Sequence, residues 1–398
     1  MKILYTISAR GTNLNIKEGY YVHIKEIYNG LRSQGHEVHL LATSDTSLKQ
    51  DFPISHTIKH RYMPLVHHMI PYTGFIDSSS YFLKIINLQK KYKFDIIHNR
   101  WGLRNLGTHL AAKLLKIPML VENNGLGIEE KSLFSDPYPK YEEVYLKFIR
   151  KIQMKMCNHI YAVSNMVKEI MIIWGIPGDK ISVLPNAANH EMYKNVTPEL
   201  QIRKNLNWEN KTIIAYTGSL HLWYGLEILP NVFKNIFDKN QNARFLIVGN
   251  GQYKAEFQNK IKMLQLENLV HFYGAVPHSK IPSVLFEVDI VVAPYKDLPM
   301  GFFGSPLKIF EYMMAGKTIV TTAIGQNSEV LEHNKTALLV PPENSTGMTD
   351  AILKLIQNPD IAKNLGINAK KEAMEKHTWK QYCKKLLILY DWIIKNGK

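Results

Sequence analysis

The pattern with the clearest chemical meaning is a serine–proline pair followed by a lysine and a glutamate: Ser305, Pro306, Lys308 and Glu311. Ser305 is typical of a helix N-cap and Pro306 of the first helical position, where a missing N–H costs nothing. The free N–H groups at such a helix start attract anions, and Lys308 adds a full positive charge. Glu311 points the same way as Lys308. The pattern predicts that Lys308 binds a diphosphate and Glu311 ribose hydroxyls; an ordinary Lys–Glu pair on a capped surface helix is the alternative.

Glycines stand where phosphate-binding turns are expected. Gly249 and Gly251 follow an apolar segment typical of a strand, as a ligand-side turn would. A glycine lets the backbone approach a phosphate closely at a helix start. Position 254 is lysine, so the dinucleotide fingerprint Gly-x-Gly-x-x-Gly is not completed there, and the first strand also lacks it. This argues against a dehydrogenase.

Two titratable residues of the first half are candidates for catalysis. Glu122 and His98 lie near the ends of expected strands, and we predict that Glu122 contacts a substrate directly and that His98 faces the cleft. Each has a structural alternative, because a carboxylate at a strand end can bond to backbone and a buried histidine can be satisfied in the core. Cys157 and Cys383 show no metal-ligand spacing, so neither a disulfide framework nor a zinc site is expected.

Short apolar segments alternate with amphipathic helical patterns along almost the whole chain. This alternation favours βαβ units and parallel sheets, and two successive sets predict an α/β protein of two doubly wound, Rossmann-like lobes. Such sheets bind ligands at the carboxyl ends of their strands, so we expect the active site in the cleft between the lobes. The expected strands are residues 2–7, 36–42, 96–98, 119–122, 159–163 and 181–184 in the first lobe and 213–216, 244–248, 270–272, 290–293, 318–321 and 337–340 in the second.

Length and charge limit the possible functions. A chain of 398 residues favours two domains. The net charge of +15 admits nucleic acid, an anionic membrane surface or phosphorylated small molecules as partners. No nucleic-acid-binding motif is recognisable, so we expect no nucleic-acid partner, while peripheral contact with an anionic membrane stays open. The first residues read as a strand and not as a signal peptide, so we expect a cytoplasmic protein, at most peripheral at the inner membrane face.

The stretch from Ser305 to Glu311 resembles the donor-binding signature of GT-B glycosyltransferases of family 4, a family of retaining enzymes. The similarity continues in order along nearly the whole chain, which makes it more specific than any single motif. The similar segments include Asn99-Arg100-Trp101, Val121-Glu122-Asn123-Asn124-Gly125, Leu184-Pro185-Asn186, Tyr216-Thr217-Gly218-Ser219-Leu220, Trp223-Tyr224-Gly225-Leu226, Phe272-Tyr273-Gly274-Ala275-Val276-Pro277 and Ala293-Pro294-Tyr295.

A polar stretch over residues 194–211 with few strand formers places the domain boundary near residues 187–210. The resemblance implies the roles of the two domains and a set of site residues. Residues 1–190 would form the acceptor-side domain, 191–375 the nucleotide-sugar-binding domain, and 376–398 a helix that crosses back to the first domain. The catalytic candidates are Lys308, Glu311, Glu122 and His98. The donor-binding set is Gly19, Gly218, Ser219, Tyr224, Gly225, Gly249, Gly251, Val276, Ser305, Pro306, Lys308 and Glu311. The acceptor-side set is Glu18, Arg100, Glu122, Asn123 and Asn186.

We therefore expect a hexosyltransferase whose co-substrate is a UDP- or GDP-linked nucleotide sugar. The enzyme would move a hexose-type sugar from this donor to a sugar, lipid-linked or small-molecule acceptor. The pathway expected is polysaccharide or glycoconjugate biosynthesis. The chain has no Asp-x-Asp pair, which transferases that hold the donor through a divalent cation typically use. This favours a reaction without metal or other cofactor, in which Lys308 stabilises the leaving diphosphate. A nucleotide-sugar epimerase or another GT-B enzyme is the first alternative, and a non-catalytic nucleotide-sugar-binding homologue is the second.

The chain departs from the family pattern in three places. The glycine pair commonly found after the first strand is reduced to Glu18-Gly19, and Gly19 would still let the backbone approach a phosphate at the start of the helical pattern over residues 20–34. Much of the family has a glutamate where this chain has Phe303, so the identity of the sugar does not carry over. The phosphate loop commonly offers arginine and lysine, where Ser219 and Tyr224 stand here, leaving Lys308 as the main cation.

The last segment, residues 378–398, is a helical pattern with one aromatic stripe that needs a surface to cover it. The stripe consists of Trp379, Tyr382, Leu386, Leu387, Tyr390 and Ile394. The resemblance implies that it packs on the first lobe. A peripheral membrane helix is the alternative, because several lysines in the segment could meet anionic lipid.

Overall fold

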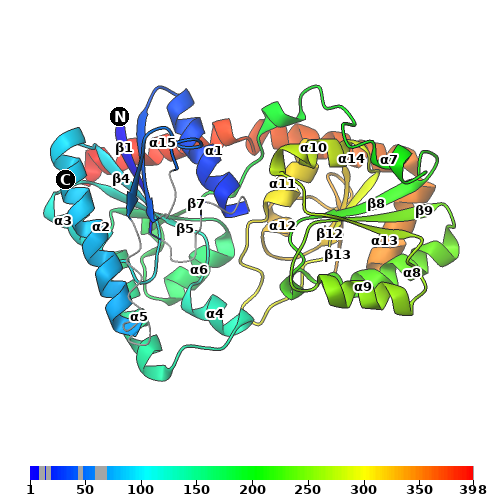
Figure 1. The fold of residues 1–398 in the computed structure, drawn as a ribbon, viewed down its shortest axis with the longest axis horizontal. Helices are drawn as coiled ribbons and strands as arrows, with labels where there is room; N and C mark the ends of the chain where they lie inside the picture. Colours follow the sequence, from blue (N-terminus) through cyan, green and yellow to red (C-terminus); the bar gives the residue numbers. More distant parts are fainter. Residues whose placement is uncertain (9–13, 15–18, 44–47, 59–69, 398) are drawn as a thin grey trace. The chain divides into compact units, whose positions relative to one another are not determined.

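The computed structural model describes residues 1–8, 14, 19–43, 48–58 and 70–397. Contacts within the chain divide it into two units: unit 1 comprises Met1–Pro185 together with Trp379–Lys398, and unit 2 comprises Asn186–Thr378. Each unit is built on one parallel sheet with helices packed on it (Figure 1). No helix in the described part of the chain is long and apolar enough to cross a membrane.

Unit 1 contains a seven-stranded sheet in the order β3-β2-β1-β4-β5-β6-β7, with parallel pairing throughout its described strands. The strand order switches direction at β1, and such a switch point is where parallel sheets usually bind ligands. The strands are β1 (Lys2–Ile7), β2 (Glu37–Thr43), β3 (Ser55–Ile58), β4 (Ile96–Arg100), β5 (Met119–Asn123), β6 (His159–Ala162) and β7 (Ile181–Val183).

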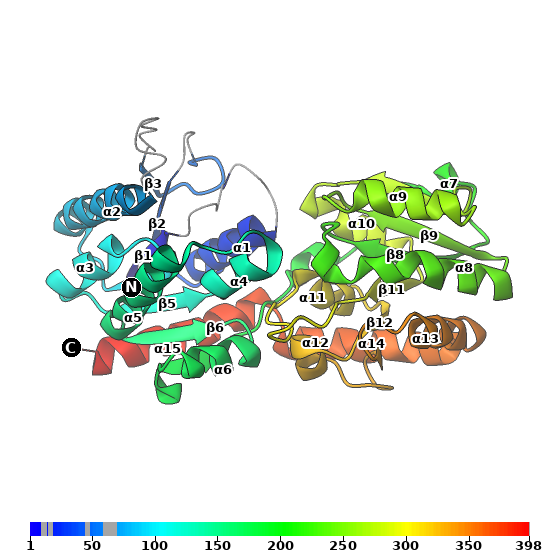
Figure 2. The ribbon, with the colours of Figure 1, turned by 90° about the horizontal axis from the view of Figure 1, so that it is seen from below.

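The helices of unit 1 lie on both faces of this sheet (Figure 2). Most of β1, β4 and β5 is therefore buried, which explains their apolar sequences. The helices are α1 (Gly19–Ser33), α2 (Ile70–Tyr92), α3 (Gly107–Leu114), α4 (Ile128–Phe134), α5 (Lys140–Met156), α6 (Asn165–Ile173) and α15 (Trp379–Asn396).

Unit 2 contains a six-stranded parallel sheet in the order β10-β9-β8-β11-β12-β13, which switches direction at β8. The strands are β8 (Thr212–Thr217), β9 (Ala243–Val248), β10 (Val270–Gly274), β11 (Ile290–Ala293), β12 (Thr318–Thr322) and β13 (Leu338–Val340). The helices are α7 (Ile202–Asn205), α8 (Leu229–Lys239), α9 (Lys254–Met263), α10 (Ile281–Phe286), α11 (Leu307–Met314), α12 (Gly325–Val330), α13 (Ser345–Gln357) and α14 (Pro359–Lys376).

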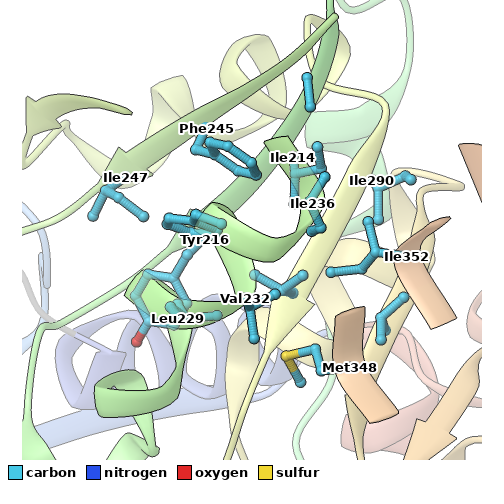
Figure 3. Packing of buried hydrophobic residues seen from close by; sticks show 14 of the residues in the cluster. Ile214, Tyr216, Leu229, Val232, Ile236, Phe245, Ile247, Ile290, Met348 and Ile352 are labelled. Carbon is cyan, nitrogen blue, oxygen red and sulfur yellow. The ribbon is translucent and has the colours of Figure 1, made fainter. Parts of the chain in front are cut away.

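Two apolar clusters, one on each face of the sheet, form the core of unit 2. Residues of α8, α9 and α13 pack against one face, as Val232, Phe245 and Ile352 illustrate (Figure 3). Residues of α10, α11 and α14 pack against the other face. Consequently α11, which carries Lys308, is anchored through buried Ile309 and Phe310.

The structure confirms the predicted α/β class and the two parallel sheets. Each strand predicted from the sequence is present, with bounds that differ by at most two residues. The exception is β3, which the sequence did not indicate. This edge strand consists of Ser-His-Thr-Ile, all half-buried, so it has neither an apolar run nor a clear alternation.

The stripe of the last helix differs in two positions from the prediction. Helix α15 buries Trp379, Tyr382, Leu386 and Tyr390, but Leu387 and Ile394 are half-buried, and Cys383 and Ile393 are buried instead. The helix packs against α1 and β5 within unit 1.

Candidate functional site

The start of α11 differs from its sequence prediction. Ser305 is not the N-cap, because the helix begins at Leu307 and Pro306 is the residue before it. Instead, Ser305 binds Asn186: its Oγ accepts a hydrogen bond of 2.9 Å from the Asn186 N–H, and its carbonyl accepts one of 2.5 Å from the side-chain amide. Asn186, predicted on the acceptor side, therefore supports the donor motif within unit 2.

Lys308 lies in a cage of three tyrosine rings. Its Nζ is 4.0 Å from the ring centroid of Tyr216, 4.5 Å from that of Tyr224 and 5.7 Å from that of Tyr295. It donates a 2.6 Å hydrogen bond to the hydroxyl of Tyr216, whose ring belongs to the core cluster beside Leu229 (Figure 3). Lys308 is only 9 % exposed, and this burial lowers its pKa to about 7, although the Glu311 carboxylate opposes the shift. Lys308 is thus a largely desolvated amine that an anion would readily pair with.

Glycine turns bring the backbone close to Lys308. Gly218 follows β8 with φ 130°, and a Cβ there would lie 2.6 Å from the lysine Nζ. Gly249 and Gly251 follow β9, and their Cβ atoms would lie 1.9 Å and 2.3 Å from the carbonyl oxygens of Gly218 and Leu220. Side chains at these positions would force the two loops apart, so glycine is required for the loops after β8 and β9 to meet.

Glu311 lies one turn after Lys308 on α11 and is held by a histidine that the sequence did not indicate. Its Oε1 is 2.5 Å from Nε2 of His278, which follows β10. Glu311 is 8 % exposed, whereas the His278 side chain is 27 % exposed. The His278 contact therefore fixes the orientation of the carboxylate, which can still accept further hydrogen bonds.

The other predicted donor-binding residues of unit 2 surround this arrangement. The Ser219 carbonyl accepts a 2.7 Å hydrogen bond from the Tyr216 hydroxyl, which fixes the loop after β8. Gly225 has φ 67°, and a Cβ there would lie 1.7 Å from the Pro294 carbonyl oxygen. Val276 is half-buried and packs on the core beneath α11.

Glu122, at the end of β5, is fully buried at the centre of a polar network in unit 1. Its Oε1 contacts the Arg100 guanidinium and lies 2.9 Å from His23 Nε2. Its Oε2 accepts a 2.8 Å hydrogen bond from Tyr5 and lies 3.2 Å from His98 Nε2. Burial by itself would raise the pKa of Glu122, but the charges and hydrogen bonds of Arg100 and His23 hold it well below its usual range. This enclosure favours a structural role over direct contact with an acceptor.

His98, in β4, is enclosed in the same way. Its Nδ1 is 2.7 Å from the Tyr390 hydroxyl, and its Nε2 is 3.0 Å from the Tyr161 hydroxyl. The Tyr382 hydroxyl donates to that of Tyr161 at 3.2 Å. Burial lowers the pKa of His98, although Glu122 opposes this shift. The residue thus links β4 to β6 and to α15 instead of standing at a surface.

The remaining predicted residues are more scattered. Asn123 is fully buried beside Glu122, and its Oδ1 accepts a 3.3 Å hydrogen bond from the Gly125 N–H. Gly19 is exposed at the start of α1. Glu18 lies outside the described residues. Unit 1 therefore brings Arg100 and His98 to the Glu122 carboxylate, and α1, which begins at Gly19, contributes His23 to the same network.

Sequence reasoning did not assign roles to Tyr216, Tyr295 and His278. The two tyrosines could have been found from their places in the sequence. Tyr216 lies near the carboxyl end of β8 and Tyr295 just after β11, and these strands are neighbours in the sheet. The role of His278 could not be predicted in this way, because only the fold brings it to Glu311. In the described part of the chain, no group of three or more His, Cys, Asp or Glu side chains is placed to hold a metal ion.

Two family profiles match the chain one after the other. The profile described as "Glycosyltransferase Family 4" matches residues 19–192, and the profile described as "Glycosyl transferases group 1" matches residues 198–372. The first match falls largely in unit 1 and the second within unit 2.

Curated relatives and solved structures resemble the chain over nearly its full length. An uncharacterized glycosyltransferase of Methanocaldococcus jannaschii is 24 % identical over 94 % of both chains. The 2-deoxystreptamine N-acetyl-D-glucosaminyltransferase of Niallia circulans is 22 % identical over 90 % of this chain and 93 % of its own. The crystal structure of Anabaena HepE in complex with UDP superposes with a TM-score of 0.76 at 18 % identity, covering 98 % of this chain and 100 % of HepE.

Proposed function

Because this chain is a family 4, or group 1, glycosyltransferase with the GT-B fold, we propose that it is a retaining, metal-independent hexosyltransferase with a UDP- or GDP-linked donor. In this proposal unit 2 binds the nucleotide sugar and unit 1 receives the acceptor. The observation that carries it is the buried Lys308, caged by tyrosines beside the glycine turns at the switch point of the unit 2 sheet. Anabaena HepE has been crystallised with UDP-glucose, which supports a donor of this class.

Lys308 would act electrostatically in the transfer step. As the bond between the anomeric carbon and the diphosphate oxygen breaks, negative charge grows on the diphosphate, and a fixed cation in a desolvated cage stabilises it. Glu311, oriented by His278, would hold the ribose. The acceptor hydroxyl would attack the anomeric carbon from the face that the diphosphate leaves, and a diphosphate oxygen would take the hydroxyl proton, which retains the configuration.

The acceptor proposed is a sugar, lipid-linked or small-molecule hydroxyl, in the synthesis of cell-surface polysaccharide or glycoconjugate. The named relatives support this range: one acts on 2-deoxystreptamine and another, from Saccharomyces cerevisiae, is a phosphatidylinositol N-acetylglucosaminyltransferase subunit. Both cysteines are free and buried, which suits the cytoplasm as the proposed compartment.

Thermal unfolding in the presence of nucleotides and nucleotide sugars tests the donor site. A ligand at a hundred times its dissociation constant stabilises the protein by about 2.7 kcal/mol, so the true donor should stand out among UDP, GDP and their hexose conjugates. Lys308→Ala should remove most of this stabilisation and cripple turnover through the lost diphosphate charge. Glu311→Gln should mainly raise KM. Lys335→Ala, at an exposed ion pair of unit 2, is the matched control and should behave as wild type.

Two results would contradict the proposal. Wild-type turnover in Lys308→Ala, measured with the true donor, would remove the cage from the mechanism. An epimerase would convert the nucleotide sugar into its epimer when no acceptor is present. Detection of such an epimer, in place of free sugar, would therefore indicate the epimerase alternative.

A further inference from the structure

Helix α5 of unit 1 carries four large apolar residues on its outer side. Tyr141 and Val144 are each 68 % exposed, Phe148 is 61 % exposed and Tyr145 is 40 % exposed. Their spacing of three, four and seven positions from Tyr141 places them on one face of the helix. The helix also buries an apolar set, Leu146, Ile149 and Met154, as a surface helix normally does. The opposite side of such a helix is normally polar, so the exposed apolar face of α5 is a second one without a covering element among the described residues.

Polar contacts fix this orientation of the helix. Glu142 and Arg150 point inward and are 3 % and 5 % exposed. Glu142 is paired with Arg104, and Arg150 donates to both carboxylate oxygens of Glu129 at 2.7 and 2.9 Å. Gln153 is fully buried and donates to two backbone carbonyls at 2.9 and 3.0 Å. Rotating the helix to hide its apolar face would break all of these contacts, so the face is a built feature of unit 1.

The outward side of α5 is also basic. Lys140, Lys147, Lys151 and Lys155 are all exposed, and helical spacing places them along one margin of the apolar stripe. Glu143, which pairs with Lys147 at 2.5 Å, is half-buried. Tyrosine and phenylalanine beside lysines are typical of a helix that lies in a membrane interface, with the rings among the headgroups and the lysines at anionic lipid.

We propose that α5 docks unit 1 on an anionic lipid bilayer surface. Tyr141, Val144, Tyr145 and Phe148 enter the interface, and the four lysines pair with lipid phosphates. A second copy of this chain fits the face less well, because a two-fold interface between α5 helices would set the lysines of one copy near those of the other. The docking goes beyond the proposed transfer reaction and does not depend on which sugar is moved.

Vesicle co-sedimentation of the full-length protein tests the docking. Wild type should bind vesicles of phosphatidylcholine containing about one third phosphatidylglycerol, and bind vesicles of phosphatidylcholine alone much more weakly. The double variant Tyr141→Ser/Phe148→Ser should lose about tenfold or more in apparent affinity. The matched control is Met263→Ser/Phe286→Ser in unit 2, which removes two exposed apolar side chains, 82 % and 53 % exposed, and should bind as wild type.

A fluorescent label gives a direct readout of insertion. Cys157 and Cys383 are both buried, so an introduced surface cysteine can be labelled selectively. An environment-sensitive dye on Val144→Cys should shift to shorter wavelength with the anionic vesicles, and the same dye on Met263→Cys should not shift. The triple variant Lys140→Gln/Lys151→Gln/Lys155→Gln should weaken binding to anionic vesicles and remove most of its salt dependence.

Three results would overturn the proposal. Wild type could fail to bind anionic vesicles, or Tyr141→Ser/Phe148→Ser could bind them like wild type. Alternatively, sedimentation equilibrium could show a dimer that Tyr141→Ser/Phe148→Ser converts to a monomer, which would assign the face to a second copy. Unchanged melting temperatures of the variants, expected because all the substituted residues are exposed, exclude misfolding as the cause.

Discussion

The ammonium group of Lys308 illustrates how one side chain can be prepared for a diphosphate. Taking a cation out of water is unfavourable, and the faces of Tyr216, Tyr224 and Tyr295 compensate only in part. The pKa of Lys308 therefore falls to about 7. In the proposed mechanism, a diphosphate that enters the cage would supply a counter-charge and raise this pKa again. We therefore expect donor binding and protonation of Lys308 to be coupled.

We predict that nucleotide affinity falls as the pH rises above about 7. The protonated form of Lys308 binds the anion, and deprotonation of the free protein above its pKa removes that form. Between pH 7 and 9 the dissociation constant should rise by up to about tenfold per pH unit, as titration calorimetry with UDP and GDP can measure. Lys308→Met should bind more weakly and with no pH dependence in this range. A flat wild-type profile would show that the lysine is protonated throughout.

Glu122 should matter for stability more than for chemistry. Glu122→Gln leaves the Arg100 side chain, which is only 11 % exposed, without its counter-charge, so we expect the free energy of unfolding to fall by about 3 kcal/mol at pH 7. Because the folded pKa of Glu122 is depressed, its stabilisation is fully present above the ordinary carboxyl pKa and is lost as the pH falls through the lower, folded value. Urea unfolding at several pH values measures both effects.

The control for this substitution is Glu143→Gln on α5, whose carboxylate forms an i,i+4 pair with Lys147. It should change the stability by no more than about 0.5 kcal/mol. A Glu122→Gln protein that is as stable as wild type but inactive would restore the direct acceptor role that the sequence suggested.

At the scale of elements, α15 completes unit 1 although it follows unit 2 in the chain. It buries Trp379, Tyr382, Leu386 and Tyr390 against α1 and the sheet. The Tyr390 hydroxyl also reaches His98. The helix therefore contributes both apolar burial and a polar contact to the network around Glu122.

We predict that deleting residues 378–398 destabilises unit 1 and abolishes activity. The milder Tyr390→Phe should cost about 1–3 kcal/mol, because it leaves Nδ1 of His98 buried without a partner. Ile388→Ala on the same helix removes a side chain that is 68 % exposed and should be nearly neutral in thermal unfolding. A truncated protein that stays folded and active on a soluble acceptor, but no longer sediments with anionic vesicles, would make α15 the membrane contact instead.

The sequence was informative where a local pattern controls the structure. Apolar runs located the buried strands, because a strand covered on both faces must be apolar throughout. It failed at Ser305, where a hydrogen bond from distant Asn186 takes the oxygen that would have capped α11. It also left the role of Glu122 open, since its partners come from β1, α1 and β4. Contacts of this kind depend on the tertiary fold and leave no trace in residue spacing.

At the scale of the whole molecule, we predict that transfer survives a chelator. The expectation rests on the missing Asp-x-Asp pair and on Lys308 as the cation for the diphosphate. Turnover should remain within about twofold of its original value in EDTA, in line with electrostatic catalysis by fixed protein groups. Loss of activity in EDTA with recovery in Mn²⁺ or Mg²⁺ would show that a divalent ion holds the donor.

Unit 1 is discontinuous in the chain, and this sets the order in which the protein can mature on the ribosome. Its seven strands are synthesised first, but α15 follows only after the 193 residues of unit 2. At about 5–20 residues per second this is a delay of roughly 10–40 s. During that time α1 lacks its cover and His98 lacks the Tyr390 hydroxyl, so the nascent unit 1 exposes an apolar surface to chaperones. Unit 2 is contiguous and can fold without waiting, so docking of α15 is the late step that closes unit 1.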